Sequence, residues 1–166
     1  MIISIKDIDA FVFDFDGVLT NNIVHLDENG GEWVSCSRSD GLAFDALKKL
    51  NKSVYILSTE KNPVVTARAM KLKIPVLQGV TDKSLSLREL AKQENFNLQR
   101  VMYVGNDLND FYAMKLCGFS LCPSDSHSKI IEISDATLKA TGGNGAVREI
   151  LEDILGLNLL KILYDK

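Results

Sequence analysis

The sequence has few of the residues that build disulfide frameworks or zinc sites. Its three cysteines, Cys36, Cys117 and Cys122, are an odd number and form no CxxC pair. This pattern indicates reduced structural thiols and not a disulfide scaffold. The two histidines, His25 and His127, complete no credible set of zinc ligands with them. We therefore expect a fold that depends on neither disulfides nor zinc.

Long apolar runs and excess basic charge are also missing. The opening segment MIISIKDID lacks the apolar stretch of a signal peptide, and the apolar run Leu157–Tyr164 is too short to span a bilayer. We expect a cytoplasmic protein with no membrane partner. The net charge of −3 and the pI near 5.4 argue against a nucleic-acid surface. They do not exclude an anionic substrate, because one metal ion can invert the charge at a site.

What the sequence does contain is enough for one folded domain. The chain has 166 residues, of which 46% are hydrophobic and 25% charged, as in soluble globular proteins of ordinary size. It shows no repeat, low-complexity stretch or linker. We expect a single domain over residues 1–166, with a short apolar tail at about 157–166.

Short apolar runs alternate with amphipathic segments along the chain. The runs that read as buried strands are Ala10–Phe15, Ser53–Leu57, Pro75–Leu77, Val101–Val104 and Phe119–Cys122. The segments that read as helices lie at about 41–51, 63–72, 82–95, 108–117, 127–134 and 145–156, with Pro63 and Thr81 as signals of helix starts. This alternation predicts an α/β fold, a Rossmann-like three-layer sandwich with a central parallel sheet. In such sheets, sites lie outside the carboxyl ends of the strands.

One segment interrupts the alternation. Asn22–Val34 reads as two short strand-like pieces around the turn sequence Glu28-Asn29-Gly30-Gly31, which predicts a β-hairpin. Because it follows the first strand directly, we expect the hairpin to project over the site and not to join the sheet.

Polar side chains follow the predicted strands. Asp14 and Asp16 come after the first strand and lie on the same side of an extended chain. Two facing carboxylates need a cation or a shared proton, and Mg²⁺ prefers such hard oxygen ligands. The plainer alternative is a pair of loop aspartates that cap the turn before Gly17.

Polar side chains also follow three later predicted strands. Ser58 follows the second strand, Lys83 falls in the first turn of a helix, and Asp107 and Asp110 share one face of another helix start. Taken alone, these residues read as a backbone cap, a solvated lysine and acids that match the helix dipole. Chance does not readily explain their joint placement: an acid pair, a hydroxyl, a lysine and a second acid pair follow one another at successive strand ends.

This ordered set resembles the haloacid dehalogenase superfamily of phosphohydrolases, through DFDGVLT at 14–20 and GNDLND at 105–110. The hairpin, the segment Arg38-Ser39-Asp40-Gly41, LQGVTDK at 77–83 and GGNGAVRE at 142–149 are similar to the small capless branch. That branch includes 3-deoxy-octulosonate 8-phosphate phosphatases and nine-carbon sugar-acid 9-phosphate phosphatases.

The resemblance implies a mechanism. Asp14 attacks phosphorus to form an aspartyl-phosphate, and Asp16 protonates the leaving alcohol and then activates water. Ser58 and Lys83 bind the phosphoryl group, while Mg²⁺ bridges Asp14, the Asp16 carbonyl, the phosphate and the second acid cluster. The family usually has an aspartate where this chain has Asn106. Which of Asn106, Asp107 and Asp110 binds Mg²⁺ directly is not decided by the sequence.

The segment Ser58-Thr59-Glu60 is more similar to the nine-carbon branch than to the eight-carbon branch. The resemblance places four side chains near the sugar end of the substrate: Thr59, Glu60, Arg68 and Lys71. For Arg68 and Lys71 an ordinary solvated helix face explains the sequence equally well. We expect a nine-carbon, acylneuraminate-type 9-phosphate as substrate, with 3-deoxy-D-manno-octulosonate 8-phosphate as the alternative.

The resemblance also implies an assembly and leaves two rivals. It implies a homotetramer in which the hairpin covers another subunit's site, and a functional link to a cytidylyltransferase. One rival is a signalling receiver domain, in which the accepting aspartate ends a later strand, and the DxD signature running into Gly17 disfavours it. The other is a catalytically weak regulatory or interaction domain, which the Asn106 change keeps open.

Overall fold

The fold is built on one parallel sheet. The computed structural model describes residues 3–165. Its six-stranded sheet has the order β5-β4-β1-β6-β7-β8, and every neighbouring pair is parallel. The strands are β1 (Ala10–Phe13), β4 (Ser53–Leu57), β5 (Val76–Leu77), β6 (Val101–Val104), β7 (Phe119–Cys122) and β8 (Ala136–Thr137).

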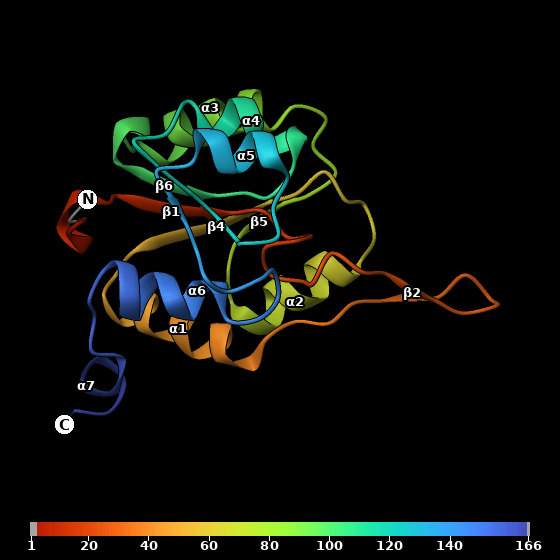
Figure 1. The fold of residues 1–166 in the computed structure, drawn as a ribbon, viewed down its shortest axis with the longest axis horizontal. Helices are drawn as coiled ribbons and strands as arrows, with labels where there is room; N and C mark the ends of the chain where they lie inside the picture. Colours follow the sequence, from red (N-terminus) through yellow and green to blue (C-terminus); the bar gives the residue numbers. More distant parts are fainter. Residues whose placement is uncertain (1–2, 166) are drawn as a thin grey trace.

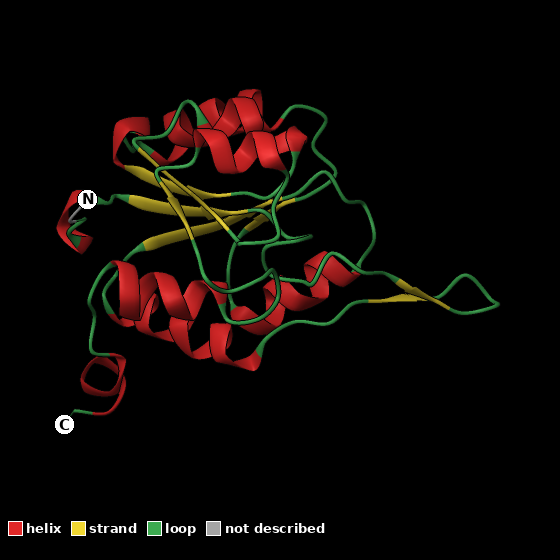
Figure 2. Ribbon diagram, viewed as in Figure 1, coloured by secondary structure: helices red, strands yellow, loops and turns green. Residues whose placement is uncertain are grey.

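Helices cover both faces of this sheet, as Figures 1 and 2 show. On one face lie α1 (Arg38–Lys49), α2 (Val64–Leu72) and α6 (Ala146–Glu149), and on the other lie α3 (Lys83–Glu94), α4 (Phe111–Met114) and α5 (Ser128–Ile133). The C-terminal α7 (Leu159–Tyr164) packs on α1. The predicted α/β three-layer sandwich is therefore confirmed.

The central strand β1 shows why the sheet has two cores. Phe11 and Phe13 point to the core shared with α1 and α6, whereas Ala10 and Val12 belong to the core on the α3 side. All four side chains are fully buried, as a strand covered on both faces requires. Phe13 is in register with Ile56 of β4 and Val104 of β6. The carboxyl ends of these three strands therefore meet at one edge.

The predicted strands are confirmed, with β1 ending at Phe13 and β5 beginning at Val76. The helix starts differ more. The helix expected from about 41 begins at Arg38, where Ser37 accepts a hydrogen bond from the Ser39 N–H. The third helix is capped by Asp82 and not by Thr81, because the Asp82 carboxylate accepts from the N–H groups of Ser84 and Leu85.

The second half of the chain is less regular than the sequence predicts. The helix expected at about 108–117 is a 3₁₀ turn, Leu108–Asp110, followed by the short α4, and the one expected at about 145–156 is α6 followed by a π-helical turn, Ile150–Ile154. The sequence analysis missed β8 and assigned no helix to the apolar tail, which forms α7. The buried Leu159 anchors this last helix.

The predicted hairpin forms between β2 (His25–Leu26) and β3 (Glu32–Trp33), which pair antiparallel outside the main sheet. It extends away from the layered body (Figure 1). One contact ties its stem to the loop before α2: the Asn62 amide donates to the Glu32 carboxylate at 2.7 Å. The hairpin does not join the main sheet, as expected. Of this segment, Asn22 alone lines the site cavity of the same chain.

Two expectations from what the sequence lacks can be compared with the structure. Cys36, Cys117 and Cys122 are all free thiols. None of the helices within residues 3–165 combines the length and the apolar character needed to cross a bilayer.

Candidate active site

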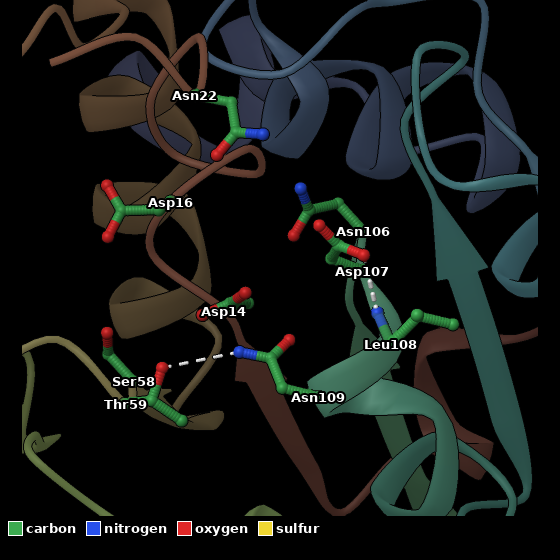
Figure 3. Close-up of a pocket in the computed structure, with 9 residues that line it drawn as sticks. All are labelled: Asp14, Asp16, Asn22, Ser58, Thr59, Asn106, Asp107, Leu108 and Asn109. Atoms are coloured by element: carbon green, nitrogen blue, oxygen red, sulfur yellow. Dashed lines mark hydrogen bonds between the residues drawn. The ribbon is translucent and has the colours of Figure 1, made fainter.

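A cavity of about 300 Å³ opens at the carboxyl edge of β1, β4 and β6. Figure 3 shows the side chains that surround it. They come from the loops that follow these three strands: Asp14, Asp16, Asn22, Ser58, Thr59, Asn106, Asp107, Leu108 and Asn109. The structure thus brings together most of the residues that the sequence analysis singled out. The cavity lies where the chain switches direction across the sheet, as in other open α/β folds.

The loop after β1 is shaped by Gly17 and Thr20. Gly17 has φ +79°, and a Cβ there would lie 1.8 Å from the Asn106 amide nitrogen, so any other residue would strain the turn and displace the Asn106 side chain. The Thr20 hydroxyl donates to Asp16 at 3.3 Å and accepts from the N–H groups of Gly17 and Asn22, each at 3.2 Å. One buried hydroxyl therefore fixes both the turn and the Asp16 carboxylate.

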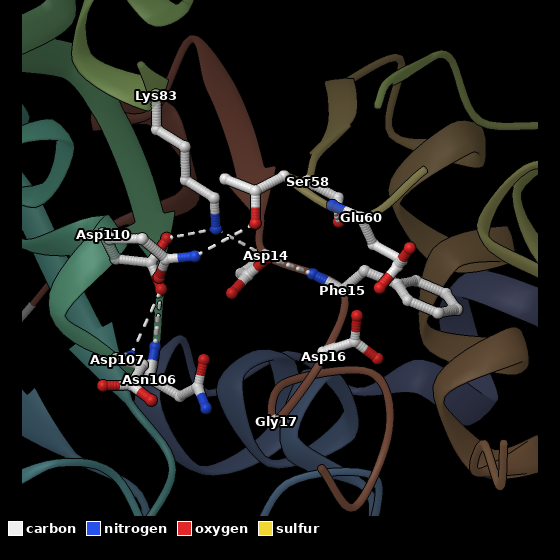
Figure 4. A network of polar contacts seen from close by, with 12 residues as sticks. Asp14, Phe15, Asp16, Gly17, Ser58, Glu60, Lys83, Asn106, Asp107 and Asp110 are labelled. Carbon is white, nitrogen blue, oxygen red and sulfur yellow. Dashed lines mark hydrogen bonds and ion pairs between the residues drawn. The ribbon is translucent and has the colours of Figure 1, made fainter. Parts of the chain in front are cut away.

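Lys83 reaches the end of β1 from the first turn of α3. Its ammonium lies 2.7 Å from Oδ1 of Asp14 and 2.7 Å from Oδ1 of Asp110, and all three side chains are buried (Figure 4). Burial alone would lower the pKa of Lys83, but the two carboxylates raise it above its usual value. Lys83 is therefore a permanent cation beside Asp14.

Asp110 is fully occupied by protein donors. Its Oδ1 accepts from Lys83 and from the Tyr103 hydroxyl at 2.8 Å, and its Oδ2 accepts from the N–H groups of Asn106 and Asp107 at 3.0 and 3.3 Å. A Cβ on Gly105 would lie 2.6 Å from Asp110. This carboxylate holds Lys83 and the 105–107 loop in place and has no free direction for a metal ion.

Asn106 has the opposite character. It is buried, yet its side-chain oxygen Oδ1 has no hydrogen-bond partner in the described part of the chain. An unpartnered buried acceptor costs about 1–3 kcal/mol unless something else satisfies it. The oxygen lines the cavity that also holds Asp14 and Asp16, as Figure 3 shows. This unpartnered oxygen is therefore suited to coordinate a cation.

Asp107 is exposed at the cavity rim, and its carboxylate caps its own turn by accepting from the Leu108 N–H at 2.7 Å. Within residues 3–165 there is no cluster of three or more His, Cys, Asp or Glu side chains arranged as a metal site. The donors here are instead one buried carboxylate, one amide oxygen and main-chain carbonyls. Mg²⁺ typically binds one or two carboxylates and completes its shell with water and substrate phosphate, so this set suits it.

The loop after β4 supplies hydroxyl groups and backbone donors. Ser58 is buried, and its hydroxyl oxygen accepts from the Glu60 N–H at 3.1 Å. Thr59 accepts from the Asn109 amide at 3.3 Å, which joins the two rims of the cavity. The Glu60 carboxylate turns back to accept from the N–H groups of Lys61 and Asn62. Ser58 and Thr59 line the cavity, and Glu60 lies just outside it.

Arg68 and Lys71 do not reach this cavity within one chain. They line a separate groove with Cys36, Arg38 and Leu42. The Arg68 guanidinium donates to the Ser37 carbonyl oxygen at 2.8 Å. The structure therefore does not bring these two basic residues together with Asp14 in a single subunit.

The two aspartates of DFDGVLT differ in their electrostatics. Burial and the charge of Asp110 raise the pKa of Asp14, while Lys83 and the Phe15 N–H oppose this effect. A further cation beside Asp14 would favour its carboxylate form. Burial also raises the pKa of Asp16, and the hydrogen bond from Thr20 opposes that rise. A carboxyl group with a raised pKa suits proton donation near neutral pH.

Several residues of the site escaped the sequence analysis. Asn22 and Asn109 line the cavity, and Tyr103, which reads as a core residue of β6, donates to Asp110. The glycine-rich loop at 142–145 supports the site from behind. A Cβ on Gly142 would lie 2.2 Å from the Gly17 carbonyl oxygen. Only the glycine pair GG, a sign of close backbone approach, signalled this last contact.

Comparisons with known proteins identify the family. The family model for haloacid dehalogenase-like hydrolases matches residues 39–150. The 3-deoxy-D-manno-octulosonate 8-phosphate phosphatase of Salmonella typhi is 30% identical over 151 residues, which are 90% of this chain and 80% of that protein. The chain belongs to the haloacid dehalogenase-like hydrolases.

Solved structures of this family share the fold closely. A Streptomyces avermitilis protein assigned to the HAD hydrolases is 44% identical, with a TM-score of 0.92 over 96% of this chain and 91% of that one. The 3-deoxy-D-manno-octulosonate 8-phosphate phosphatase of Moraxella catarrhalis, solved with magnesium, phosphate and KDO, is 34% identical. Its TM-score is 0.87 over 91% of this chain and 87% of that one. The present HAD-type hydrolase is a phosphatase, as the sequence analysis predicted.

Proposed function

We propose that this phosphatase hydrolyses the phosphate monoester of a 2-keto-3-deoxy sugar acid through an aspartyl-phosphate on Asp14. The observation that carries the proposal is the buried Asp14–Lys83–Asp110 cluster, whose Asp14 lines the cavity together with Asp16, Ser58 and Asn106. The cluster places a carboxylate nucleophile beside a fixed cation.

In this proposal, the chain's own residues carry the chemistry. Lys83 and the Ser58 hydroxyl bind the phosphoryl oxygens and offset the charge that spreads over them in the transition state. Asp16 donates a proton to the leaving oxygen and then takes one from the water that cleaves the aspartyl-phosphate. The Thr20 hydroxyl holds Asp16 in place for both steps.

The residues also fit Mg²⁺. Asp14, the main-chain carbonyl of Asp16 and the orphaned Oδ1 of Asn106 would hold the ion, with Asp107 at the rim. When bound, Mg²⁺ supplies positive charge that polarises the phosphoryl group and offsets the repulsion between the substrate and the acidic site. Asp110 contributes indirectly, because both of its oxygens are occupied by protein donors. Among the three candidates, we favour Asn106 as the direct ligand.

The relatives favour an eight-carbon substrate over the nine-carbon one expected from the sequence. The relative from Salmonella typhi acts on 3-deoxy-D-manno-octulosonate 8-phosphate, and the one from Moraxella catarrhalis was solved with KDO. We therefore propose 3-deoxy-D-manno-octulosonate 8-phosphate as the first substrate to test.

A nine-carbon sugar-acid 9-phosphate is the second candidate. Its support is the segment Ser58-Thr59-Glu60, of which Ser58 and Thr59 line the cavity and Glu60 lies just outside it. Its weakness is that Arg68 and Lys71, expected to bind the sugar acid, line another groove of the same chain. These two residues reach a substrate only if a second subunit brings its own copies to the site.

We also propose a homotetramer in which the hairpin of one subunit covers the site of another. Four apolar side chains on the hairpin are exposed, namely Ile23, Val24, Leu26 and Trp33, at 48–66% of their full accessibility. An isolated two-stranded hairpin is marginally stable, so these side chains favour a neighbouring subunit. The cavity is open in a single chain, and phosphoryl transfer benefits from excluding water.

A phosphate-release screen tests the proposed function. The purified protein is assayed with Mg²⁺ on the eight-carbon and nine-carbon 2-keto-3-deoxy sugar-acid phosphates, with hexose phosphates and nucleotides as controls. We expect the highest kcat/KM for a sugar-acid phosphate, complete loss of activity in excess EDTA and recovery with added Mg²⁺. Preference for a hexose phosphate or nucleotide, or full activity in EDTA, contradicts the proposal.

A further inference from the structure

Asn22 has an unusual backbone at the edge of the cavity. Its φ is 61°, in the left-handed region, which is unfavourable for a residue with a Cβ, although asparagine tolerates it better than most. Its N–H donates to the Thr20 hydroxyl, the same group that donates to Asp16. The position of Asn22 is therefore fixed relative to Asp16.

The neighbouring backbone is held on its other side. A Cβ on Gly143 would lie 2.5 Å from the Asn21 nitrogen and from the Thr20 carbonyl carbon. The Gly143 N–H donates to the Val18 carbonyl oxygen at 3.0 Å, and Thr20 bridges to Cys36. Asn22 thus directly follows a backbone segment that is held on both sides, and it precedes β2 of the hairpin. The backbone position of Asn22 is therefore fixed.

The Asn22 amide faces the cavity. Figure 3 shows it at the end opposite Ser58 and Thr59, with Asp16 between them. Among residues 3–165, neither the side-chain nitrogen nor the side-chain oxygen of Asn22 has a hydrogen-bond partner. The residue is exposed and lines the cavity. An amide carries two donor hydrogens and one acceptor oxygen, and all of these are free for a ligand.

We propose that Asn22 is a specificity residue that hydrogen-bonds the hydroxylated leaving group of the substrate. This inference rests on the proposed function, in which Lys83 and Ser58 hold the phosphoryl group and Asp16 protonates the bridging oxygen. The leaving group then lies beyond Asp16, at the end of the cavity where the Asn22 amide stands. A polyol chain offers the alternating donors and acceptors that an amide matches.

The structure offers a matched control for the backbone. Asn95 also has a left-handed conformation, with φ 56°, but it is an exposed residue at the C-terminus of α3. Replacing either asparagine by glycine removes an amide and relieves the same backbone strain. Only the change at residue 22 alters the cavity wall.

The test compares Asn22→Gly, Asn22→Asp and Asn95→Gly with the wild type on 3-deoxy-D-manno-octulosonate 8-phosphate and p-nitrophenyl phosphate. We expect Asn22→Gly to raise KM for the sugar-acid phosphate about fivefold, the loss of one net hydrogen bond, with a smaller fall in kcat. Asn22→Asp, which keeps an acceptor but loses both donors, should raise it at least as much. Asn95→Gly should match the wild type.

The outcomes separate this inference from the proposed function. If the wild type hydrolyses the sugar-acid phosphate and Asn22→Gly leaves its KM unchanged, the inference is overturned and the proposed function stands. A fall in kcat at unchanged KM also overturns it, because it shows that Asn22 acts only by supporting Asp16. If the wild type hydrolyses p-nitrophenyl phosphate but no sugar-acid phosphate, the proposed function falls and the inference falls with it.

Discussion

At the scale of single residues, the site depends on a buried charge cluster. Lys83 satisfies two carboxylates, and Tyr103 and two backbone N–H groups satisfy the rest of Asp110. Such a cluster is a weak source of stability, because desolvation offsets most of the attraction between buried charges. Its value here is geometric, since it fixes a cation beside Asp14 before any substrate arrives.

The contrasting role of Asp16 leads to a prediction about leaving groups. Asp16→Asn removes the proposed proton donor but keeps a side chain of the same size. We expect it to slow hydrolysis of a sugar phosphate by about 10²–10⁴-fold, because an alkoxide needs protonation to leave. p-Nitrophenolate leaves without it, so that substrate should slow far less. Steady-state kcat values for both substrates decide this, and equal slowing of the two would rule out the acid role.

Asp40 makes a prediction about pH and stability. It is buried in α1, and burial raises its pKa to about 6, although the N–H groups of Arg148, Val147 and Gly145 oppose the shift. The folded-state pKa lies above the unfolded one, so the folded state holds the proton more tightly. The stability that this proton contributes is present below about pH 4 and is lost as pH rises through about 6.

Asp40→Asn removes this titration, so the free energy of unfolding of the variant, relative to the wild type, should increase with pH. We expect a relative gain of about 2 kcal/mol between pH 4 and pH 7.5, following the size of the pKa shift. Urea denaturation at several pH values measures it. Asp45→Asn, an exposed site on the same helix, is the control. A difference that does not change with pH would show that Asp40 does not titrate in this range.

At the scale of elements, the loop between β8 and α6 forms the back wall of the site. Gly142 and Gly143 lie against the backbone of Gly17 and Thr20, and Asp125 accepts from the Gly142 N–H at 2.9 Å. The Asp16 loop is therefore held between this glycine pair on one side and Asn106 on the other.

Gly142→Ala tests this arrangement. The new methyl group meets backbone atoms that cannot rotate away, so we expect a loss of about 1–3 kcal/mol in the free energy of unfolding together with a lower kcat. Gly41→Ala, within α1, is the matched control, because its Cβ would meet only Leu72 at 3.9 Å and alanine favours a helix. Thermal unfolding and kcat are measured for both. Wild-type values for Gly142→Ala would show that the loop is loose.

The elements also show what the sequence can predict. All five apolar runs form strands. Four of them are mostly buried, as strands covered on both faces are, whereas β5 is a half-buried edge strand. β8 was missed because a strand of only Ala136–Thr137 has no pattern of its own. The residues after each strand converge because register fixes the edge they share. The difference between Asp110 and Asn106 was not predictable, because it depends on which donors reach each side chain in the fold. Tyr103 reads as a core residue of β6, and Lys83 lies 27 residues from Asp110.

The sequence also did not predict the direction in which some side chains and the hairpin point. Arg68 and Lys71 have the spacing of one helix face, but the sequence does not tell which groove that face borders. Asn22 reads as the first residue of the predicted hairpin until its backbone is seen beside Asp16. The hairpin was predictable from its glycine turn, but its direction away from the body was not, because few contacts between the hairpin and the body specify it.

At the scale of the whole molecule, the cavity of a single chain is open and the apolar side chains of its hairpin are exposed. The proposed tetramer would cover both. We expect light scattering to give the mass of a tetramer at micromolar concentration. Activity should also pass between subunits: Asp14→Asn subunits with intact hairpins, mixed with subunits carrying Leu26→Ala and Trp33→Ala, should restore the turnover that each lacks alone. A monomeric mass, or no recovery in the mixture, would end the proposal of a cover supplied by a second subunit.

The proposed mechanism requires that Asp14 receives the phosphoryl group. An acid quench of the Mg²⁺-loaded enzyme during turnover of a substrate with a radioactive phosphate, followed by peptide mapping, tests this step. We expect labelled protein whose phosphate maps to the peptide containing Asp14, is released by hydroxylamine as an acyl-phosphate should be, and is absent in Asp14→Asn. Label on another residue, or retained turnover by Asp14→Asn, would contradict it.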